Sequence, residues 1–297
     1  KQYSVSMNKF AFKSTFSLLN VDYVQLNKSW NYKHIISPFY RLYLISEGCG
    51  TLYNATQSIT LESGYLYLIP SFTSCSYVCP EHLIQYYLHI LEDSSDEASL
   101  FIANRKIMKV SAVSTDFTHF KRLLELNPDR GLLKSENPED YEKRPIIQGF
   151  QELNNRLSLS AYVEIQGIML QLVSRFLEVA SFQLEPASTI PFKVSEAIRY
   201  IQTHLQTNLT VEHLAEIAHQ NPDYFSRIFK ENTGERPLAY IQLKRIERAQ
   251  FLMITSDLTF NEIAAETGFE SLAYFSRMFK KVTGQTPSVY RKNNRRV

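Results

Sequence analysis

The stretch Tyr224-Phe225-Ser226-Arg227-Ile228-Phe229-Lys230 recurs, fifty positions later, as Tyr274-Phe275-Ser276-Arg277-Met278-Phe279-Lys280. One position differs, and it exchanges Ile for Met, two apolar side chains of similar size. The match continues beyond the stretch, with Thr-Gly at 233–234 and at 283–284 and with a proline three residues after each glycine. A near-copy of this length indicates one structural unit that the chain uses twice.

Each copy has the pattern of an amphipathic helix with an aromatic face. In the first copy Phe225, Ile228 and Phe229 recur at helical spacing, so we expect them to face a core. Asn221 predicts the start of this helix and Gly234 its end. The opposite face is polar and cationic, and its residues are candidate DNA contacts. They are Asp223, Tyr224, Ser226, Arg227 and Lys230 in the first copy and Ala273, Tyr274, Ser276, Arg277 and Lys280 in the second.

A short helix is predicted before each copy, with Thr210 and Thr259 as its caps. A short helix, a tight turn and a second helix with a cationic outer face form the helix-turn-helix pattern, expected at about 211–232 and 260–283. Gly268 supplies the second turn, whereas His219 occupies the first. One helix of about 27 Å is predicted between the motifs, and it would set two recognition helices near one DNA turn, about 34 Å, apart.

Three runs of residues in the second half resemble a known pattern. They are Arg245-Ile246-x-x-Ala249-x-x-Leu252, Ile263-Ala264-x-x-x-Gly268-Phe269 and Tyr274-Phe275-Ser276-Arg277-x-Phe279-Lys280-x-x-x-Gly284-x-x-Pro287-x-x-Tyr290-Arg291. Together they resemble the signature of the AraC/XylS family of bacterial transcription regulators over about residues 193–293. The resemblance implies an all-α DNA-binding domain at 193–297, a sequence-specific regulator that is not an enzyme, and double-stranded DNA and RNA polymerase as partners.

The outward side chains suit the readout of DNA. Arg227 and Arg277 can each bond both acceptors of a guanine edge, although a salt bridge within the domain is the alternative. The two serines can donate to a base or a phosphate, and the Ala273 methyl can touch thymine. The lysines suit phosphates, as do four cations of the C-terminal tail. These phosphate-contact candidates are Arg291, Lys292, Arg295 and Arg296. Asp223 departs from this pattern, and it suits a cytosine amino group or the positive end of its helix.

The charge of the chain is divided unevenly between its halves. Residues 193–297 hold 15 Lys and Arg against 11 Asp and Glu, whereas residues 1–192 hold 17 against 19. One basic group in the second half is formed by Lys244, Arg245 and Arg248. This distribution weakly favours a polyanionic partner.

Residues 39–92 have the alternation and composition of short β-strands. Runs at 40–45, 51–53, 58–61, 65–69 and 86–91 are separated by turn signals, among them Glu47-Gly48-Cys49-Gly50. The pattern Ile45-x-x-Gly48-x-Gly50, then Leu61-x-x-Gly64-x-x-x-x-Ile69-Pro70, resembles a cupin-type β-barrel. With the helical second half, this predicts a two-domain α+β protein. A cupin-like domain before the helix-turn-helix region is similar to the sensing and dimerising half of many AraC/XylS regulators, and this resemblance implies an effector-binding and dimerisation domain.

Many cupins are metal enzymes, so the metal ligands decide between an enzyme and a binding module. The chain has no His-x-His pair, and His34, His82 and His89 stand alone. Cys75 and Cys79 fit no zinc spacing and are expected to be reduced, buried thiols. We therefore expect no metal, no cofactor and no catalytic residue. A cupin-type metal enzyme with an appended DNA-binding domain is the alternative, and bound Fe, Mn or Zn would distinguish it.

Between the strands and the repeat the apolar period becomes helical. A helix is predicted around Phe117–Leu126 and another at 161–182, which either packs on the barrel or forms a homodimer. Residues 128–145 read as a loop, and two prolines place the linker at 186–192, after a first domain at 1–185. The 18 Tyr and 19 Phe suit an apolar or sugar-stacking effector, whose identity stays open, as does control by a protein partner. The composition predicts a soluble, cytoplasmic protein with no membrane partner.

Overall fold

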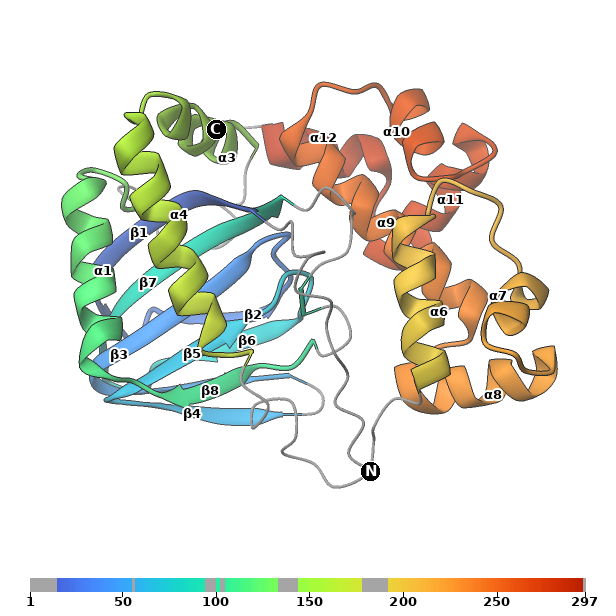
Figure 1. Cartoon of the computed structure of the whole chain (residues 1–297). Coiled ribbons are helices and arrows are strands. Elements are labelled where there is room, and N and C mark those ends of the chain that lie inside the picture. The colour runs from blue at the N-terminus through green and yellow to red at the C-terminus, as the bar shows by residue number, and fades with distance from the viewer. Residues whose placement is uncertain are drawn as a thin grey trace.

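The computed structural model of the chain describes residues 15–54, 57–93, 100–101, 105–132, 144–177 and 192–295. A sheet-rich N-terminal part stands beside a helical C-terminal part (Figure 1), as the two-domain α+β prediction requires. The predicted linker at 186–192 lies outside the described residues except for Phe192, where a helix begins. Among the described residues no helix is both long and apolar enough to cross a bilayer.

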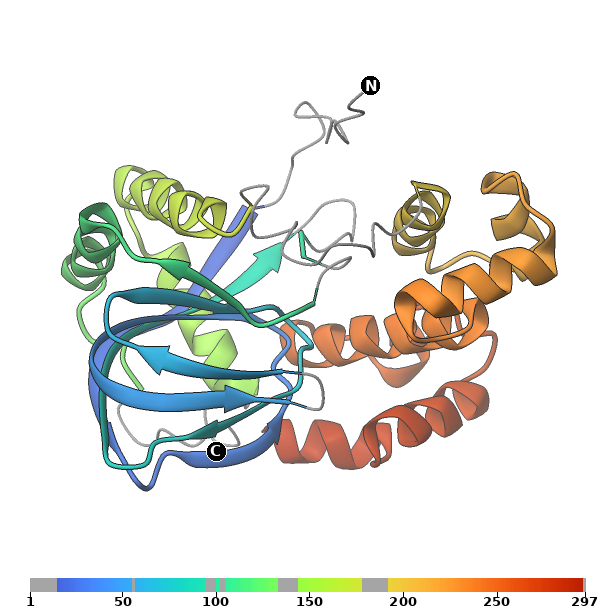
Figure 2. The ribbon, with the colours of Figure 1, turned by 90° about the horizontal axis from the view of Figure 1, so that it is seen from below.

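The N-terminal part is one antiparallel sheet that curls on itself (Figure 2). Five strands pair in the order β1-β7-β3-β5-β8. Outside this path, β4 pairs with β3, and β6 pairs with both β3 and β2. The strands are β1 Thr15–Asn27, β2 Asn31–Ile35, β3 Tyr40–Tyr53, β4 Ser58–Glu62, β5 Tyr65–Ile69, β6 Cys75–Val78, β7 His82–Asp93 and β8 Met108–Ser111. The predicted runs at 58–61, 65–69 and 86–91 are confirmed, whereas β1, β2, β6 and β8 were not expected.

The turn predicted at Glu47–Gly50 is wrong, because β3 continues through it. The register of β3 against β7 shifts between Ile45 and Glu47, which is a β-bulge, and Gly48 beside it has φ 77°. A Cβ at Gly48 would lie 2.3 Å from the carbonyl oxygen of His82. The glycine therefore bends a continuous strand so that its first half pairs with β5 and β7 and its second half with β4 and β6.

Helices α1 Ser114–Leu126 and α4 Leu159–Ser174 cover one face of the sheet (Figure 1). Phe120 of α1 and Met169 of α4 pack in one buried cluster with the strand residues Leu42 and Leu88. The helix expected at 161–182 is thus shorter at its C-terminal end, since it ends at Ser174, and residues 178–182 lie outside the described part. Helix α3 Arg144–Asn155 was not predicted, and it begins inside the segment taken for a loop.

Every expected helix of the C-terminal part is present, and its boundaries follow the predicted caps. The helices are α6 Phe192–Thr203, α7 Val211–Ile217, α8 Pro222–Thr233, α9 Pro237–Thr255, α10 Phe260–Glu266, α11 Leu272–Thr283 and α12 Pro287–Arg295. Two separate cores form, one beneath α6, α7 and α8 and one beneath α10 and α11. Helix α9 contributes Tyr240 and Ile241 to the first and Ile246 and Leu252 to the second, so it ties the two copies together.

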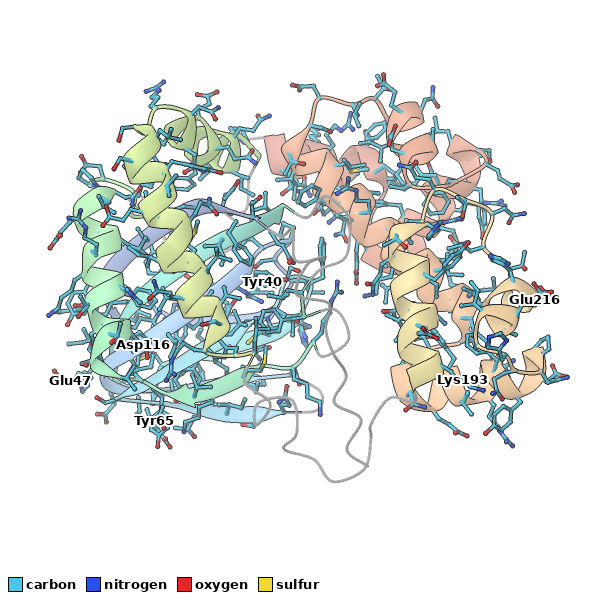
Figure 3. All side chains as sticks on the ribbon, in the orientation of Figure 1. Tyr40, Glu47, Tyr65, Asp116, Lys193 and Glu216 are labelled. Atoms are coloured by element: carbon cyan, nitrogen blue, oxygen red, sulfur yellow. The ribbon has the colours of Figure 1, made fainter. Side chains whose placement is uncertain are left out.

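The two parts of the chain meet along α9 (Figure 1). A small apolar cluster joins Leu19 of β1, Phe39, Leu91 of β7 and Ile147 of α3 to Ile254 of α9. Figure 3 shows Tyr40, at the start of β3, on the side of the sheet that faces the C-terminal helices, and Glu47, Tyr65 and Asp116 at the other end of the sheet. The start of β3 therefore lies close to the domain junction.

Candidate nucleic-acid interface

The two copied helices begin and end in the same way. The side chains of Asn221 and Ser271 accept hydrogen bonds from the first backbone N–H groups of α8 and α11. Gly234 and Gly284 close the helices in the left-handed conformation, with φ of 83° and 79°. Residues within and next to each helix thus mark both of its ends.

The faces of α8 and α11 are divided as the repeat predicts. Phe225, Phe229, Phe275 and Phe279 are fully buried, with 0% of each side chain exposed. The candidate DNA contacts lie on the other side and are exposed or half-buried. They are Asp223, Tyr224, Ser226, Arg227, Lys230, Ala273, Tyr274, Ser276, Arg277 and Lys280. Each copy therefore presents one continuous polar face on a helix held by its own core.

The paired arginines have different surroundings. Arg227 and Arg277 each lie over the tyrosine three residues earlier, at 5.3 Å from the ring of Tyr224 and 5.7 Å from that of Tyr274. Arg227 also lies 4.0 Å from the carboxylate of Glu231. Within the described residues Arg277 has no carboxylate at ion-pair distance. The salt-bridge alternative thus has a geometric basis in the first copy alone, and the guanidinium of the second is the freer to bind a ligand.

The two faces also carry different charge. Helix α8 holds Asp223 and Glu231 against Arg227 and Lys230, which leaves it neutral. Helix α11 holds Arg277, Lys280 and Lys281 with no acidic residue, a formal charge of +3. Because a duplex presents phosphates along its whole length, the second face is the more strongly attracted to DNA.

The turns before the two helices share a backbone conformation but not a residue. Gly268 has φ 75° and His219 has φ 50°, so both are left-handed. A Cβ at Gly268 would lie 2.2 Å from the carbonyl oxygen of Leu205, which only glycine permits. His219 is exposed, and its side chain points away from the core. The first turn thus tolerates a side chain at a cost in backbone strain.

Two cations of α9 do not contribute to a basic surface, contrary to their grouping with Arg248. Arg245 is 8% exposed and donates hydrogen bonds to the carbonyl oxygens of Leu205, at 3.0 Å, and Thr207, at 2.7 Å. Lys244 is 6% exposed and lies 3.1 Å from the carboxylate of Glu247. Arg245 therefore links the two motifs, and Lys244 belongs to the domain junction.

The tail candidates are only partly described. Arg291 donates a hydrogen bond of 2.8 Å to the carbonyl oxygen of Leu258 and stacks over Phe260, at 3.9 Å from the ring centre. Lys292 is exposed. Nothing is described of the side chain of Arg295 or of Arg296. The hydrogen bond of Arg291 gives it a role in holding α12 against the loop before α10, beside any role at a phosphate.

The single histidines and cysteines of the N-terminal part do not converge. Cys75 and Cys79 are buried free thiols, and burial raises the pKa of Cys75 to about 11. His89 is fully buried, and burial together with Arg41 holds its pKa well below the usual range. Among the residues that the structure describes, no group of three or more His, Cys, Asp or Glu side chains is placed to hold a metal ion.

An ion cluster at the domain junction had no signal in the sequence. Arg105, in the loop before β8, forms an ion pair of 2.6 Å with Glu247 of α9, which also pairs with Lys244. Burial alone would raise the pKa of Glu247, but the two cations lower it. The partners are 142 positions apart, and only the fold brings them together.

Comparisons with known proteins assign the C-terminal part. The family described as "Helix-turn-helix domain" matches residues 214–293. The uncharacterised HTH-type transcriptional regulator YobQ of Bacillus subtilis is 40% identical over 75 residues, which are 25% of this chain and 31% of YobQ. The HTH-type transcriptional activator Btr of the same organism is 33% identical over 121 residues, 41% of this chain and 22% of Btr. The chain thus spans under a third of the length of these relatives.

Solved structures give two kinds of match. The DNA-binding domain of AdpA in complex with a target DNA is 32% identical, with a TM-score of 0.33, over 34% of this chain and 90% of that chain. ToxT from Vibrio cholerae is 16% identical, with a TM-score of 0.48, over 97% of this chain and 100% of that chain.

Proposed function

Because the C-terminal part of this chain is a helix-turn-helix domain of the AraC/XylS family, we propose that the whole chain is a sequence-specific DNA-binding transcription regulator. The observation that carries the proposal is the pair of equivalent exposed faces on α8 and α11, each held by buried phenylalanines. Helix α9 connects these faces at a fixed spacing, so one chain can present two recognition helices to one side of a duplex.

The proposed roles follow the chemistry of each face. Arg277 and Arg227 read guanine edges, and Ser276 and Ser226 donate to a base or a phosphate. Lys280 and Lys230 neutralise phosphates, and Lys292 extends this contact beyond α12. Asp223 and Ala273 stand at the same place in the two copies and suit a cytosine amino group and a thymine methyl group, so the copies would prefer different base sequences.

We assign the N-terminal part to a cupin-like module that binds a small effector and forms a homodimer. The curled sheet covered by α1 and α4 supports such a module. Leu159, Tyr162 and Val163 project from the start of α4 and are 78%, 38% and 59% exposed, a patch that suits a second copy of the chain. The family resemblance implies contacts with RNA polymerase, and the name of the relative Btr is the ground for proposing activation.

Selection of duplexes from a random pool by the full chain, followed by binding measurements, tests the proposal. Arg277→Ala is expected to weaken binding to the selected site by about 10- to 100-fold and to weaken binding to random DNA far less, since a bidentate base contact is worth about 1 to 3 kcal/mol. Lys121→Ala, at an exposed position of α1 in the N-terminal part, is the control. Equal losses on both DNAs would make Arg277 a phosphate contact, and failure to select any sequence would contradict specific regulation.

A further inference from the structure

The two helix-turn-helix motifs are joined by a second connection besides the length of α9. Among the described residues their hydrophobic cores share no member, and α7 and α8 lie at the opposite end of the C-terminal part from α10 (Figure 1). A single helix between two separate cores bends and twists, and the recognition helices would then turn relative to each other. The second connection is made where the segment 205–207, which joins α6 to α7, meets the turn of the second motif.

Arg245 of α9 holds this segment in place. Its Nε donates a hydrogen bond of 3.0 Å to the carbonyl oxygen of Leu205, and its Nη2 donates one of 2.7 Å to that of Thr207. The guanidinium lies 5.8 Å from the ring centre of Phe269, a member of the second core, whereas Leu205 belongs to the first. Because a planar guanidinium fixes the directions of its donors, the two bonds fix both the position and the orientation of the segment.

The turn of the second motif packs against the same segment. A Cβ at Gly268 would lie 2.2 Å from the carbonyl oxygen of Leu205 and 2.9 Å from Nη2 of Arg245, so the backbone of the turn approaches both closely. Beside it, Nε2 of Gln206 donates a hydrogen bond of 2.9 Å to the carboxylate of Glu266, the last residue of α10. Residues 205–207, Arg245 and Gly268 together form a clamp between the two motifs.

The clamp lies next to the start of the second recognition helix. Gly268 precedes Ser271, the cap of α11, by three residues, and the helix begins at Leu272. On the other side of the clamp, the segment 205–207 leads into α7 and from there to α8. A change at the clamp therefore moves α11 relative to α8, while each motif keeps its own core of buried phenylalanines. The equivalent residue of the first turn, His219, is exposed.

We propose that Arg245 determines DNA specificity without touching DNA, as a positioning residue. The clamp fixes α11 relative to α8, so the chain recognises two sequence elements at one separation along the duplex. One added base pair shifts the second element by about 3.4 Å and turns it by about 35° around the helix axis. A rigid pair of recognition helices does not follow such a shift, and the base contacts of one helix are lost. The inference rests on the proposed function, since it requires both helices in the major groove.

Binding of the full chain to the selected site, with and without one base pair inserted between its two elements, tests the role of Arg245. The insertion is expected to weaken binding of the unchanged chain at least tenfold, but that of Arg245→Met less than threefold. Thr207→Ala keeps the accepting carbonyl and should retain the full penalty. If Arg245→Met weakens binding to both duplexes by the same factor, Arg245 only stabilises the fold and the proposal is overturned. Tolerance of the insertion by the unchanged chain would also overturn it.

Distances between two spin labels test the clamp without DNA. The labels are placed on Glu231→Cys of α8 and Lys281→Cys of α11, both exposed, with Cys49→Ser as background because Cys49 is the exposed thiol and the other two are buried. We expect one narrow distance distribution, and a broad one in Arg245→Met.

If Arg245→Met does not fold, Arg245→Lys takes its place, since an ammonium group lacks the planar fork that fixes both carbonyls. An unchanged distribution and an unchanged insertion penalty in that variant would overturn the proposal. A distribution that broadens in a chain that selects no DNA sequence would support the clamp and refute the proposed function alone.

Discussion

The two helix-turn-helix copies share a scaffold and differ on the surface and at the turn. Both helices begin at a side-chain cap, bury two phenylalanines and end at a left-handed glycine. Yet α8 is neutral and its arginine has an acidic neighbour, whereas α11 carries three cations and no acid. The repeated core therefore preserves the position of the helix, and we propose that the more cationic second copy supplies more of the electrostatic attraction to DNA. Changes at matched positions test this division.

The largest effect is expected at the turns. Gly268→Ala adds a methyl group where a Cβ would lie 2.2 Å from the Leu205 carbonyl oxygen, in a left-handed backbone. We expect a loss of about 3 kcal/mol or more in the free energy of unfolding, measured by chemical denaturation. His219→Ala at the matched position should change it by less than about 1 kcal/mol, since His219 already adopts φ 50°. Similar losses in both variants would refute the difference between the turns.

The helices that follow the copies, α9 and α12, differ as well, because Lys244 of α9 is buried in an ion pair with Glu247. Burial lowers the pKa of Lys244 to about 8, below its ordinary 10.5, although Glu247 opposes the shift. The folded state therefore binds fewer protons than the unfolded state between about pH 8 and 10.5, so stability should rise with pH over that interval. Lys244→Met should remove this rise and add about 2 kcal/mol at pH 7, measured by denaturation at several pH values.

The matched variant of the second copy supplies the control for this change. Asn294 occupies the position equivalent to Lys244, and Asn294→Met should leave the pH dependence as it is. If Lys244→Met instead destabilises the chain at pH 7, the charged lysine is a net stabilising partner of Glu247.

The charge on the exposed faces of α8 and α11 is expected to give the next largest effect, on DNA affinity. Each phosphate neutralised by a lysine adds about 0.9 to the slope of log affinity against log salt. Replacing Lys280 and Lys281 together with Met should therefore lower the slope by about 1.8, a loss near tenfold in affinity at low salt. The matched change in the first copy, Lys230→Met, should lower it by about 0.9 or less. Titrations of the selected site at several salt concentrations measure both, and a larger change for Lys230 would reverse the order of the two copies.

The C-terminal part could be predicted from local signals and the N-terminal part much less well. Caps such as Thr210, Asn221 and Gly284 act within a few residues, so the helix boundaries were readable in the sequence. Strand β1 escaped prediction because its buried residues do not alternate regularly; Leu18 and Leu19 are both buried beside a β-bulge. The bulge at Gly48 has the residues of a turn and was taken for one.

Some residues of the candidate site were also predictable from local signals, and others were not. The outward positions of Arg227 and Arg277 follow from helical periodicity, so the sequence was sufficient to place them. The burial of Lys244 and Arg245 was not predictable, because Arg105 and the Leu205 carbonyl reach α9 only when separate elements pack. The pair of Lys244 with Glu247 is local to the helix and gives no sign of burial. Long-range contacts of this kind have no local pattern in the sequence.

The smallest effect is expected for the converse substitution, which places glycine at the first turn. His219→Gly removes the Cβ from a residue in the left-handed conformation and so relieves its backbone strain. The free energy of unfolding should therefore rise by about 1 kcal/mol or less. The exposed side chain makes no core contact that the change would remove. A rise in stability with unchanged DNA affinity would show that His219 is only tolerated at the turn. A loss of DNA affinity without loss of stability would instead give the imidazole a place at the interface, and the first turn would then differ from the second because of function.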